Sequence, residues 1–273
     1  MADRFHNQAK QYSETRPSYP DELFQFIGSK TPNHHLAWDV GTGNGQAATS
    51  FQLARMYKNV VATDTSQKQL DFAPKLPNVR WICTAPNMSM AELQRDVAAE
   101  ASVDLITIAQ ALHWFDLPTF YQQARWVLKK PHGVIAAWCY TATDGDDSAC
   151  NSSSAFDSVF QRFYSDSGPY WDPARKLVDD KYRSIDFPFE PIDGANHTGP
   201  FEFKTERLMD LDGYFRFIRS WSAYQIAQEK GVELLRDDVM EDFKRAWTED
   251  GNNNQKLVKS SVYLRIGKVG NWK

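Results

Sequence analysis

The 273-residue sequence predicts an α/β fold in which helices flank a mainly parallel sheet. The apolar run 36–38 leads directly into the glycine-rich stretch 39–46, as at the end of a buried parallel strand. Short apolar runs then alternate with helical patterns as far as residue 140. No internal repeat or composition shift marks a second domain, so we expect one domain over residues 1–273.

The first 30 residues are expected to form a helical arm ahead of the sheet. Residues 4–13 have the spacing of a short helix, with Tyr12 on its apolar face. The segment Arg16-Pro17-Ser18-Tyr19-Pro20 is a rigid corner, and Pro20 can open a helix over 21–29. This arm either packs as part of the core or covers a ligand site.

The glycine-rich stretch Asp39-Val-Gly41-Thr42-Gly43-Asn-Gly45 lies between the first strand and a predicted helix over 46–54. Glycines permit positive φ and leave no Cβ between the backbone and a ligand. Backbone N–H groups at the start of the helix can then face the polar end of a ligand. The spacing is G-x-G-x-G, which disfavours the dinucleotide fingerprint G-x-G-x-x-G. An NAD site or a plain tight turn remains an alternative on this stretch alone.

The second and third strands are predicted at 59–64 and 78–84. Asp64 ends the second strand and follows Gly45 by 64 − 45 = 19 residues. A carboxylate at this place can accept two hydrogen bonds from a ribose diol. The alternative role for Asp64 is to cap the helix expected over 66–72. A further helix is expected over 91–100.

The fourth strand, 102–109, is apolar enough to be central, and it runs into the segment 110–116. A doubly wound sheet binds its ligand where its first and fourth strands lie side by side, so His113 is expected near the ligand. A buried imidazole bonded to the backbone is the alternative for His113, and plain core packing is the alternative for Trp114. A helix over 118–128 and a fifth strand over 134–140 complete this part.

The pattern changes after residue 140, and we interpret 141–200 as a cap insertion over the ligand edge of the sheet. It contains a polar loop (141–154), a helix (155–165) and an extended piece (187–191). The core resumes at 201–273. There we expect helices over 212–229 and 233–249 and an antiparallel pairing of 201–207 with 260–268.

Composition restricts the partners. The net charge is −4, the pI is about 5.9, and no basic run suggests a nucleic-acid surface. The three cysteines are scattered, the first residues lack an apolar signal region, and no run approaches a membrane span. We therefore expect a cytoplasmic protein with a small-molecule partner, no membrane or nucleic-acid partner and no metal; the oligomeric state is left open.

Four segments, which follow one another along the chain in the order typical of the family, resemble class I S-adenosylmethionine (SAM) methyltransferases. They are the stretch 38–46, the Arg-Pro-x-Tyr-Pro corner, the His113-Trp114-Phe115 segment and Ser220-Trp-Ser-Ala-Tyr224. The members most similar are those related to trans-aconitate methyltransferases and to plant embryo-abundant-type methyltransferases. The resemblance implies a Rossmann-like seven-stranded sheet closed by an antiparallel hairpin. It also implies SAM as cofactor and S-adenosylhomocysteine (SAH) as product.

The resemblance assigns the residues of the site. The cofactor-binding residues are expected to be Tyr12, Arg16, Asp39, Gly41, Thr42, Gly43, Gly45, Asp64, Thr65, Ala85, Met88 and Gln110. The substrate-binding residues are expected to be Tyr19, His113, Trp114, Tyr140, Trp171, Trp221 and Tyr224. Many members carry an acid beside the adenine, whereas the turn 85–88 has none.

The expected reaction is in-line transfer of a methyl group to a small organic acceptor, through a carboxylate or hydroxyl oxygen. An ionised carboxylate needs no base, whereas a hydroxyl or amine does, and His113 is the candidate catalytic base. The alternatives are N-methylation, a SAM-binding protein that catalyses another reaction, and an NAD-dependent oxidoreductase.

Overall fold

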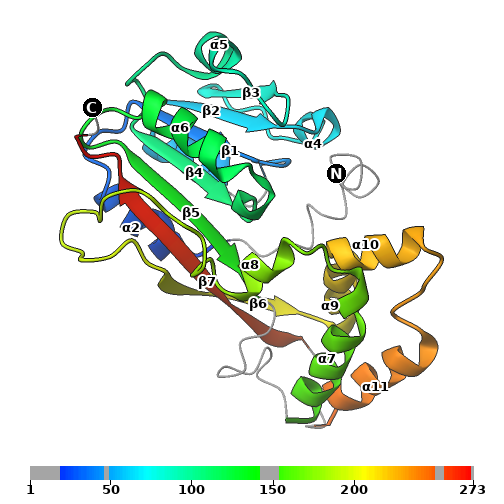
Figure 1. Ribbon diagram of the computed structural model, residues 1–273. Helices are drawn as coiled ribbons and strands as arrows, with labels where there is room; N and C mark the ends of the chain where they lie inside the picture. Colours follow the sequence, from blue (N-terminus) through cyan, green and yellow to red (C-terminus); the bar gives the residue numbers. More distant parts are fainter. Residues whose placement is uncertain (1–18, 46–48, 142–153, 250–254, 272–273) are drawn as a thin grey trace.

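The computed structural model describes residues 19–45, 49–141, 154–249 and 255–271. Its centre is a seven-stranded sheet with the order β3-β2-β1-β4-β5-β7-β6 (Figure 1). The strands are β1 (Leu36–Val40), β2 (Asn59–Asp64), β3 (Val79–Cys83), β4 (Leu105–Ala109), β5 (Val134–Tyr140), β6 (Phe201–Met209) and β7 (Lys256–Lys268). The α/β class and the seven strands predicted from the sequence are confirmed.

The first five strands run parallel, and the last two close the sheet as an antiparallel hairpin. Trp38 of β1 lies between Val61 of β2 and Ile106 of β4, both in parallel register. Strand β7 runs antiparallel to β5, with Trp138 opposite Leu264, and β6 pairs antiparallel with β7. The predicted hairpin is confirmed, although β7 begins at Lys256, before the expected residue 260.

Helices cover both faces of the sheet, as expected for parallel strands (Figure 1). One face carries α2 (Asp21–Ser29) and α3 (Thr49–Met56), and the other carries α5 (Met90–Glu92), η2 (Leu93–Val97) and α6 (Leu117–Val127). Alternate side chains of β5 belong to opposite hydrophobic clusters, Trp138 to the first and Ala137 to the second. The small helix α4 (Gln67–Asp71) lies between β2 and β3 in the sequence.

The remaining helices follow β5 in the sequence, and all but one gather at the far end of the β6–β7 hairpin; α8 (Arg175–Asp179) instead contacts the short helix η3 (Leu112–Trp114) that follows β4. They are α7 (Ser154–Asp166), η4 (Gly168–Tyr170), α8 (Arg175–Asp179), α9 (Leu211–Arg219), α10 (Ser222–Glu229) and α11 (Asp237–Trp247). Strand β5 ends where Tyr140 pairs with Val262, whereas β6 and β7 stay paired to Met209 and Lys256. The hairpin therefore extends past the parallel strands and carries these helices apart from α8 (Figure 1).

Aromatic packing joins the helices at this end of the hairpin, which together with the insertion are called the cap below. Phe156 of α7 packs edge-on against Tyr214 of α9 and against Phe243 and Trp247 of α11, with ring centroids 5.3–5.7 Å apart. Residues 211–247, which the sequence analysis placed in the core, thus pack onto the helix of the insertion.

Three elements differ from the sequence predictions. The single helix expected over 212–229 is two helices, because Trp221 has the extended backbone angles φ −70° and ψ 144°. The helix expected over 233–249 is shorter in the structure, where α11 extends from Asp237 to Trp247. The extended piece 187–191 forms no strand; Glu190 makes one isolated bridge to Lys268.

Candidate functional site

The glycine loop after β1 has one open side. Gly41, Gly43 and Gly45 all have positive φ, between 61° and 69°. A Cβ on Gly41 would lie 2.7 Å from the Cβ of Ala111, and one on Gly45 would meet the ring of Trp81. A Cβ on Gly43 would meet no atom of the described residues within 4 Å. Protein packing explains the first and third glycines, whereas the open space at Gly43 fits a ligand that approaches the backbone.

Asp39 braces this loop from inside the sheet. Its side chain is buried, and its two carboxylate oxygens accept hydrogen bonds from the hydroxyls of Thr107 (2.7 Å) and Thr42 (2.6 Å). The backbone N–H of Thr42 also donates to the carbonyl of Thr63 at 3.0 Å. These bonds tie the loop to β1, β2 and β4, so the loop is held in place before any ligand arrives.

Asp64 is fastened to the open glycine. Its Oδ2 accepts a hydrogen bond from the N–H of Gly43 at 2.7 Å, and its Oδ1 accepts one from the N–H of Ser66 at 2.9 Å. Burial raises the pKa of Asp64, and the backbone hydrogen bonds oppose that rise. The residue that caps α4 is Ser66, whose hydroxyl accepts from the N–H of Gln69. The helix-cap role considered for Asp64 therefore belongs to Ser66.

The turn expected at the adenine follows β3, next to Asp64. The N–H of Thr84 donates to the carbonyl of Asp64 at 2.9 Å, which places Ala85 beside the end of β2. Ala85 and Thr65 are exposed, whereas Met88 is half-buried and packs against the second hydrophobic cluster. The carbonyl of Met88 accepts a hydrogen bond from Gln123.

Gln110 connects the ends of β4 and β5. Its N–H donates to the carbonyl of Trp138 at 2.8 Å, and its Oε1 accepts from the N–H of Tyr140 at 2.9 Å. Its φ is +54°, which is uncommon for a residue with a Cβ. Ala111 follows at once and contacts Gly41, so the segment after β4 lies against the glycine loop.

His113 lies in this segment, on the short helix η3 (Leu112–Trp114), and it is paired with a tyrosine from the cap. Its Nδ1 is 2.9 Å from the hydroxyl of Tyr182, and its ring packs on Trp114 with centroids 4.5 Å apart. Burial, and then the nearby charge of Arg175, lower the pKa of His113 from 6.5 to about 3. The imidazole is therefore neutral at physiological pH.

Sequence analysis did not identify Tyr182 or Arg175 as site residues. They lie 69 and 62 residues beyond His113 in the chain, and no motif marks them. The one sequence signal nearby is the aromatic content of the insertion, which is common in any packed cap.

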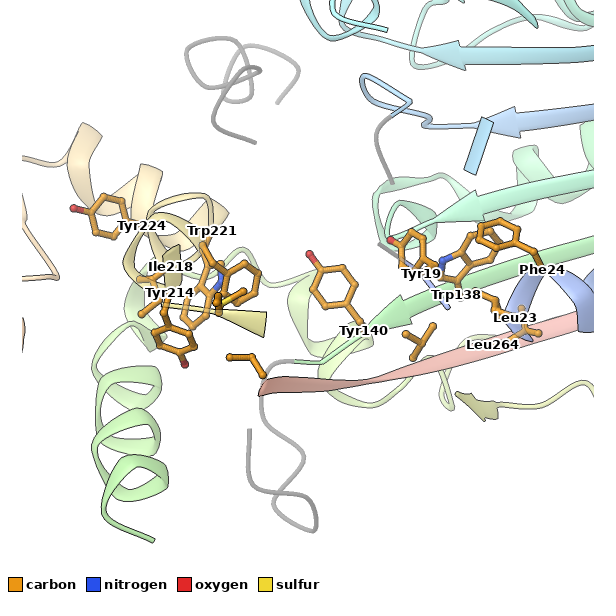
Figure 2. Close-up of a cluster of buried hydrophobic side chains, with 14 of the residues drawn as sticks. Tyr19, Leu23, Phe24, Trp138, Tyr140, Tyr214, Ile218, Trp221, Tyr224 and Leu264 are labelled. Atoms are coloured by element: carbon orange, nitrogen blue, oxygen red, sulfur yellow. The ribbon is translucent and has the colours of Figure 1, made fainter. Parts of the chain in front are cut away.

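The aromatic residues expected to bind the acceptor fall into two groups (Figure 2). Tyr19 packs edge-on against Trp138 and lies 6.3 Å from Tyr140, at the end of β5. Trp221 belongs to the cap, where its ring lies 5.5 Å from Trp171. Figure 2 shows the ring of Tyr140 between these two groups.

Tyr224 lies in the cap and already has a partner. Its side chain is buried, and its hydroxyl donates to Oε1 of Glu233 at 2.6 Å. Trp171 is half-buried, donates from Nε1 to the hydroxyl of Ser167, and carries the guanidinium of Arg175 over its ring at 4.5 Å. Arg175 therefore links the cap aromatics to His113.

Two predicted cofactor residues, Tyr12 and Arg16, lie outside the residues that the structure describes. Within the described ranges, no three His, Cys, Asp or Glu side chains are grouped so that they could hold a metal ion. No described helix combines the length and the apolar character that crossing a membrane requires.

Comparison with known proteins agrees with this geometry. The model of the methyltransferase domain family matches residues 38–137, which include β1 to β5 as far as Ala137. A Dictyostelium discoideum protein described as a methyltransferase is 34% identical over 97% of this chain and 95% of its own length. A Saccharomyces cerevisiae protein described as a SAM-dependent methyltransferase is 25% identical over 78% of each chain.

A solved structure has the same fold. It is described as a type II methyltransferase from Anaeromyxobacter dehalogenans, and it superposes with a TM-score of 0.74 and 27% identity over 93% of this chain and 98% of its own. The sheet order, the glycine loop and these relatives define a class I methyltransferase. The chain belongs to the SAM-dependent methyltransferases, and it is an enzyme with SAM as its cofactor.

Proposed function

We propose that this enzyme transfers the methyl group of SAM to an oxygen of a small organic acceptor, with a carboxylate as the preferred class. One observation supports the carboxylate most directly. His113 lies beside the glycine loop with its pKa lowered to about 3, by burial first and by Arg175 second. A base works best when its pKa is near the operating pH, so this imidazole is poorly suited to deprotonate a hydroxyl or an ammonium. A carboxylate is ionised at neutral pH and needs no base.

In this proposal the chain's own residues bind and orient the two substrates. The cofactor would bind on the open side of Gly43, and Asp64 would accept hydrogen bonds from its ribose hydroxyls; the space beside Gly43 and the bond from Gly43 to Asp64 support this arrangement. Bound SAM supplies an electrophilic methyl carbon, so the protein's task is mainly positioning. Correct positioning of two reactants can lower a barrier by roughly 7–11 kcal/mol.

The acceptor would lie between the segment after β4 and the cap. Trp114 packs on His113 and Tyr19 lies near Tyr140 on the sheet side, and Trp171 and Trp221 belong to the cap side. Aromatic side chains suit an organic ligand because they bury large apolar areas. The acidic net charge and three scattered cysteines support a small-molecule acceptor in the reducing cytosol rather than nucleic acid.

A screen tests this function. The protein is incubated with methyl-labelled SAM and a panel of aliphatic acids, aromatic acids, phenols and amines, and label in the organic products is counted. We expect methyl esters from one group of acids. Transfer only to amines would contradict the oxygen proposal, and SAH binding without transfer to any member would favour a different reaction on this fold.

A further inference from the structure

The most unusual arrangement at the site is the contact between His113 and Tyr182. Tyr182 is fully buried, and its hydroxyl lies 2.9 Å from Nδ1 of the imidazole. A buried phenol needs a polar partner, and the half-buried imidazole supplies it. No second hydrogen bond of the His113 ring is found in the described part of the chain, so its Nε2 is the nitrogen left for a ligand.

The backbone that delivers Tyr182 is held in an unfavourable conformation. Lys181 and Tyr182 have φ of +60° and +58°, although both carry a Cβ. Such conformations persist only where surrounding contacts hold them, and they cluster at functional sites. The N–H of Tyr182 donates to the carbonyl of Leu177 at 2.9 Å, and its own carbonyl accepts from the buried guanidinium of Arg265 at 2.7 Å.

The surroundings of Tyr182 determine the positions of its hydroxyl proton and of the ring proton of His113. Burial raises the pKa of Tyr182 well above its usual value, so the phenol keeps its proton. Among the described residues, Nδ1 of His113 is the hydrogen-bond partner found for this buried hydroxyl. A buried hydroxyl needs an acceptor for its proton, so the phenol directs its proton to Nδ1, and the ring proton of a neutral His113 is then on Nε2.

The neighbouring groups agree with a neutral ring. Among the residues that the structure describes, Arg175 on α8 is the charged group that faces His113, and it disfavours an imidazolium. Cys139 of β5 and Tyr19 of the arm are the titratable groups that face Tyr182, together with Arg175. None of these groups would stabilise a second proton on the imidazole.

We propose that Tyr182 is a positioning residue that holds His113 in its neutral tautomer with the proton on Nε2. In this form His113 donates a hydrogen bond to an acceptor oxygen and does not remove a proton from it. This inference rests on the proposed function, because it takes His113 to contact the methyl acceptor. It narrows the acceptor class to one that arrives already ionised, such as a carboxylate.

The tautomer is measured on the full-length protein labelled with ¹⁵N in its histidine rings. Long-range ¹H–¹⁵N correlation spectra distinguish the two neutral tautomers from the imidazolium, and the His113→Gln spectrum assigns the His113 signals. We expect the Nε2-protonated pattern, unchanged from pH 8 to pH 5. In Tyr182→Phe we expect a mixture of tautomers and a kcat lower by about 10- to 100-fold, with unchanged SAH affinity.

Tyr121→Phe is the matched control. Tyr121 is also a buried tyrosine in the second hydrophobic cluster, and its hydroxyl has no hydrogen-bond partner among the described residues. This variant should keep the wild-type tautomer and kcat. The control separates loss of the specific hydrogen bond from the general effect of removing a buried hydroxyl.

Three results would overturn the inference: a wild-type proton on Nδ1, titration of His113 between pH 5 and pH 8, or a wild-type tautomer in Tyr182→Phe. The first two do not need the Tyr182→Phe variant, so they decide the matter even if that variant does not fold. Absence of SAH binding or of methyl transfer would refute the proposed function and leave the tautomer result intact.

Discussion

The carboxylate of Asp64 accepts a hydrogen bond from the backbone N–H of Gly43 at 2.7 Å. The end of β2 is thereby fixed to the one glycine of the loop whose outer side is open. The carboxylate of Asp64 therefore shapes the loop, in addition to the ribose-binding role that we propose for it.

Replacing Asp64 should weaken cofactor binding while the protein stays folded. We expect Asp64→Ala to reduce SAH affinity by about 1.5–3 kcal/mol, the range for hydrogen bonds to charged groups, as measured by calorimetry. Ser66→Ala is the matched control, because Ser66 caps α4. It should lower the free energy of unfolding by about 1 kcal/mol and leave SAH affinity unchanged. If Asp64→Ala lost only stability and Ser66→Ala lost SAH affinity, the role given to Asp64 would be contradicted.

Gly43→Ala tests the open side of the loop. Gly43 has φ +61°, so a Cβ costs roughly 1–2 kcal/mol in backbone strain, and the new methyl group would occupy the space assigned to the cofactor. We expect both lower stability and at least a tenfold loss of SAH affinity. Gly231→Ala has the same strain without the ligand, because Gly231 has φ +73° and nothing near its Cβ. Equal SAH affinity in the two variants would show that no ligand faces Gly43.

Sequence patterns predicted the sheet well because buried parallel strands are apolar runs with clear ends. The five strands expected between residues 36 and 140 each overlap an observed strand, and the last expected strand pairs antiparallel as proposed. The break between α9 and α10 was missed for a physical reason. The aromatic spacing continues through Trp221, and no glycine or proline marks the change of direction.

The site could be predicted only in part. The positive φ of Gly43 and the position of Asp64 at the end of β2 could be predicted, because backbone conformation and strand ends leave local signals in a sequence. Tyr182 was missed because its left-handed backbone has no glycine to announce it and because tertiary contacts, such as the bond from Arg265, hold it in place. Gln110 was expected to bind the cofactor, yet its side chain pairs with the backbone of Tyr140.

His113 should make the protein sensitive to acid. The pKa of His113 is about 3 in the fold and near 6.5 when unfolded, so the unfolded chain binds its proton first. The stabilisation is complete above about pH 7 and is lost as the pH falls through 6.5 toward 3. We expect wild type to lose about 2 kcal/mol more than His113→Gln between pH 7.5 and pH 5, by urea unfolding. Carboxylate contributions cancel in this comparison, and parallel stability curves would contradict the pKa assignment.

Variants of Tyr140 and Tyr224 distinguish an effect on acceptor binding from an effect on the stability of the cap. The backbone of Tyr140 is fixed by Gln110, and its ring stands between the Tyr19 group and the cap aromatics (Figure 2). We expect Tyr140→Phe to raise the KM of the acceptor by roughly 2- to 12-fold, the equivalent of one neutral hydrogen bond, without change in SAH affinity. Tyr224 also was expected to bind the acceptor, but its hydroxyl donates to Glu233 at 2.6 Å.

Tyr224→Phe should therefore act on the fold rather than on the acceptor. Removal of the hydroxyl leaves the carboxylate of Glu233 with the bonds from Gln228 and from the N–H of Leu235. We expect a loss of about 1.5–3 kcal/mol in the free energy of unfolding and an unchanged KM, because the hydrogen bond that is lost joins Tyr224 to the charged side chain of Glu233. Steady-state kinetics with the identified acceptor and urea unfolding of both variants make the comparison. A raised KM in Tyr224→Phe with normal stability would place the acceptor deeper in the cap, against α10.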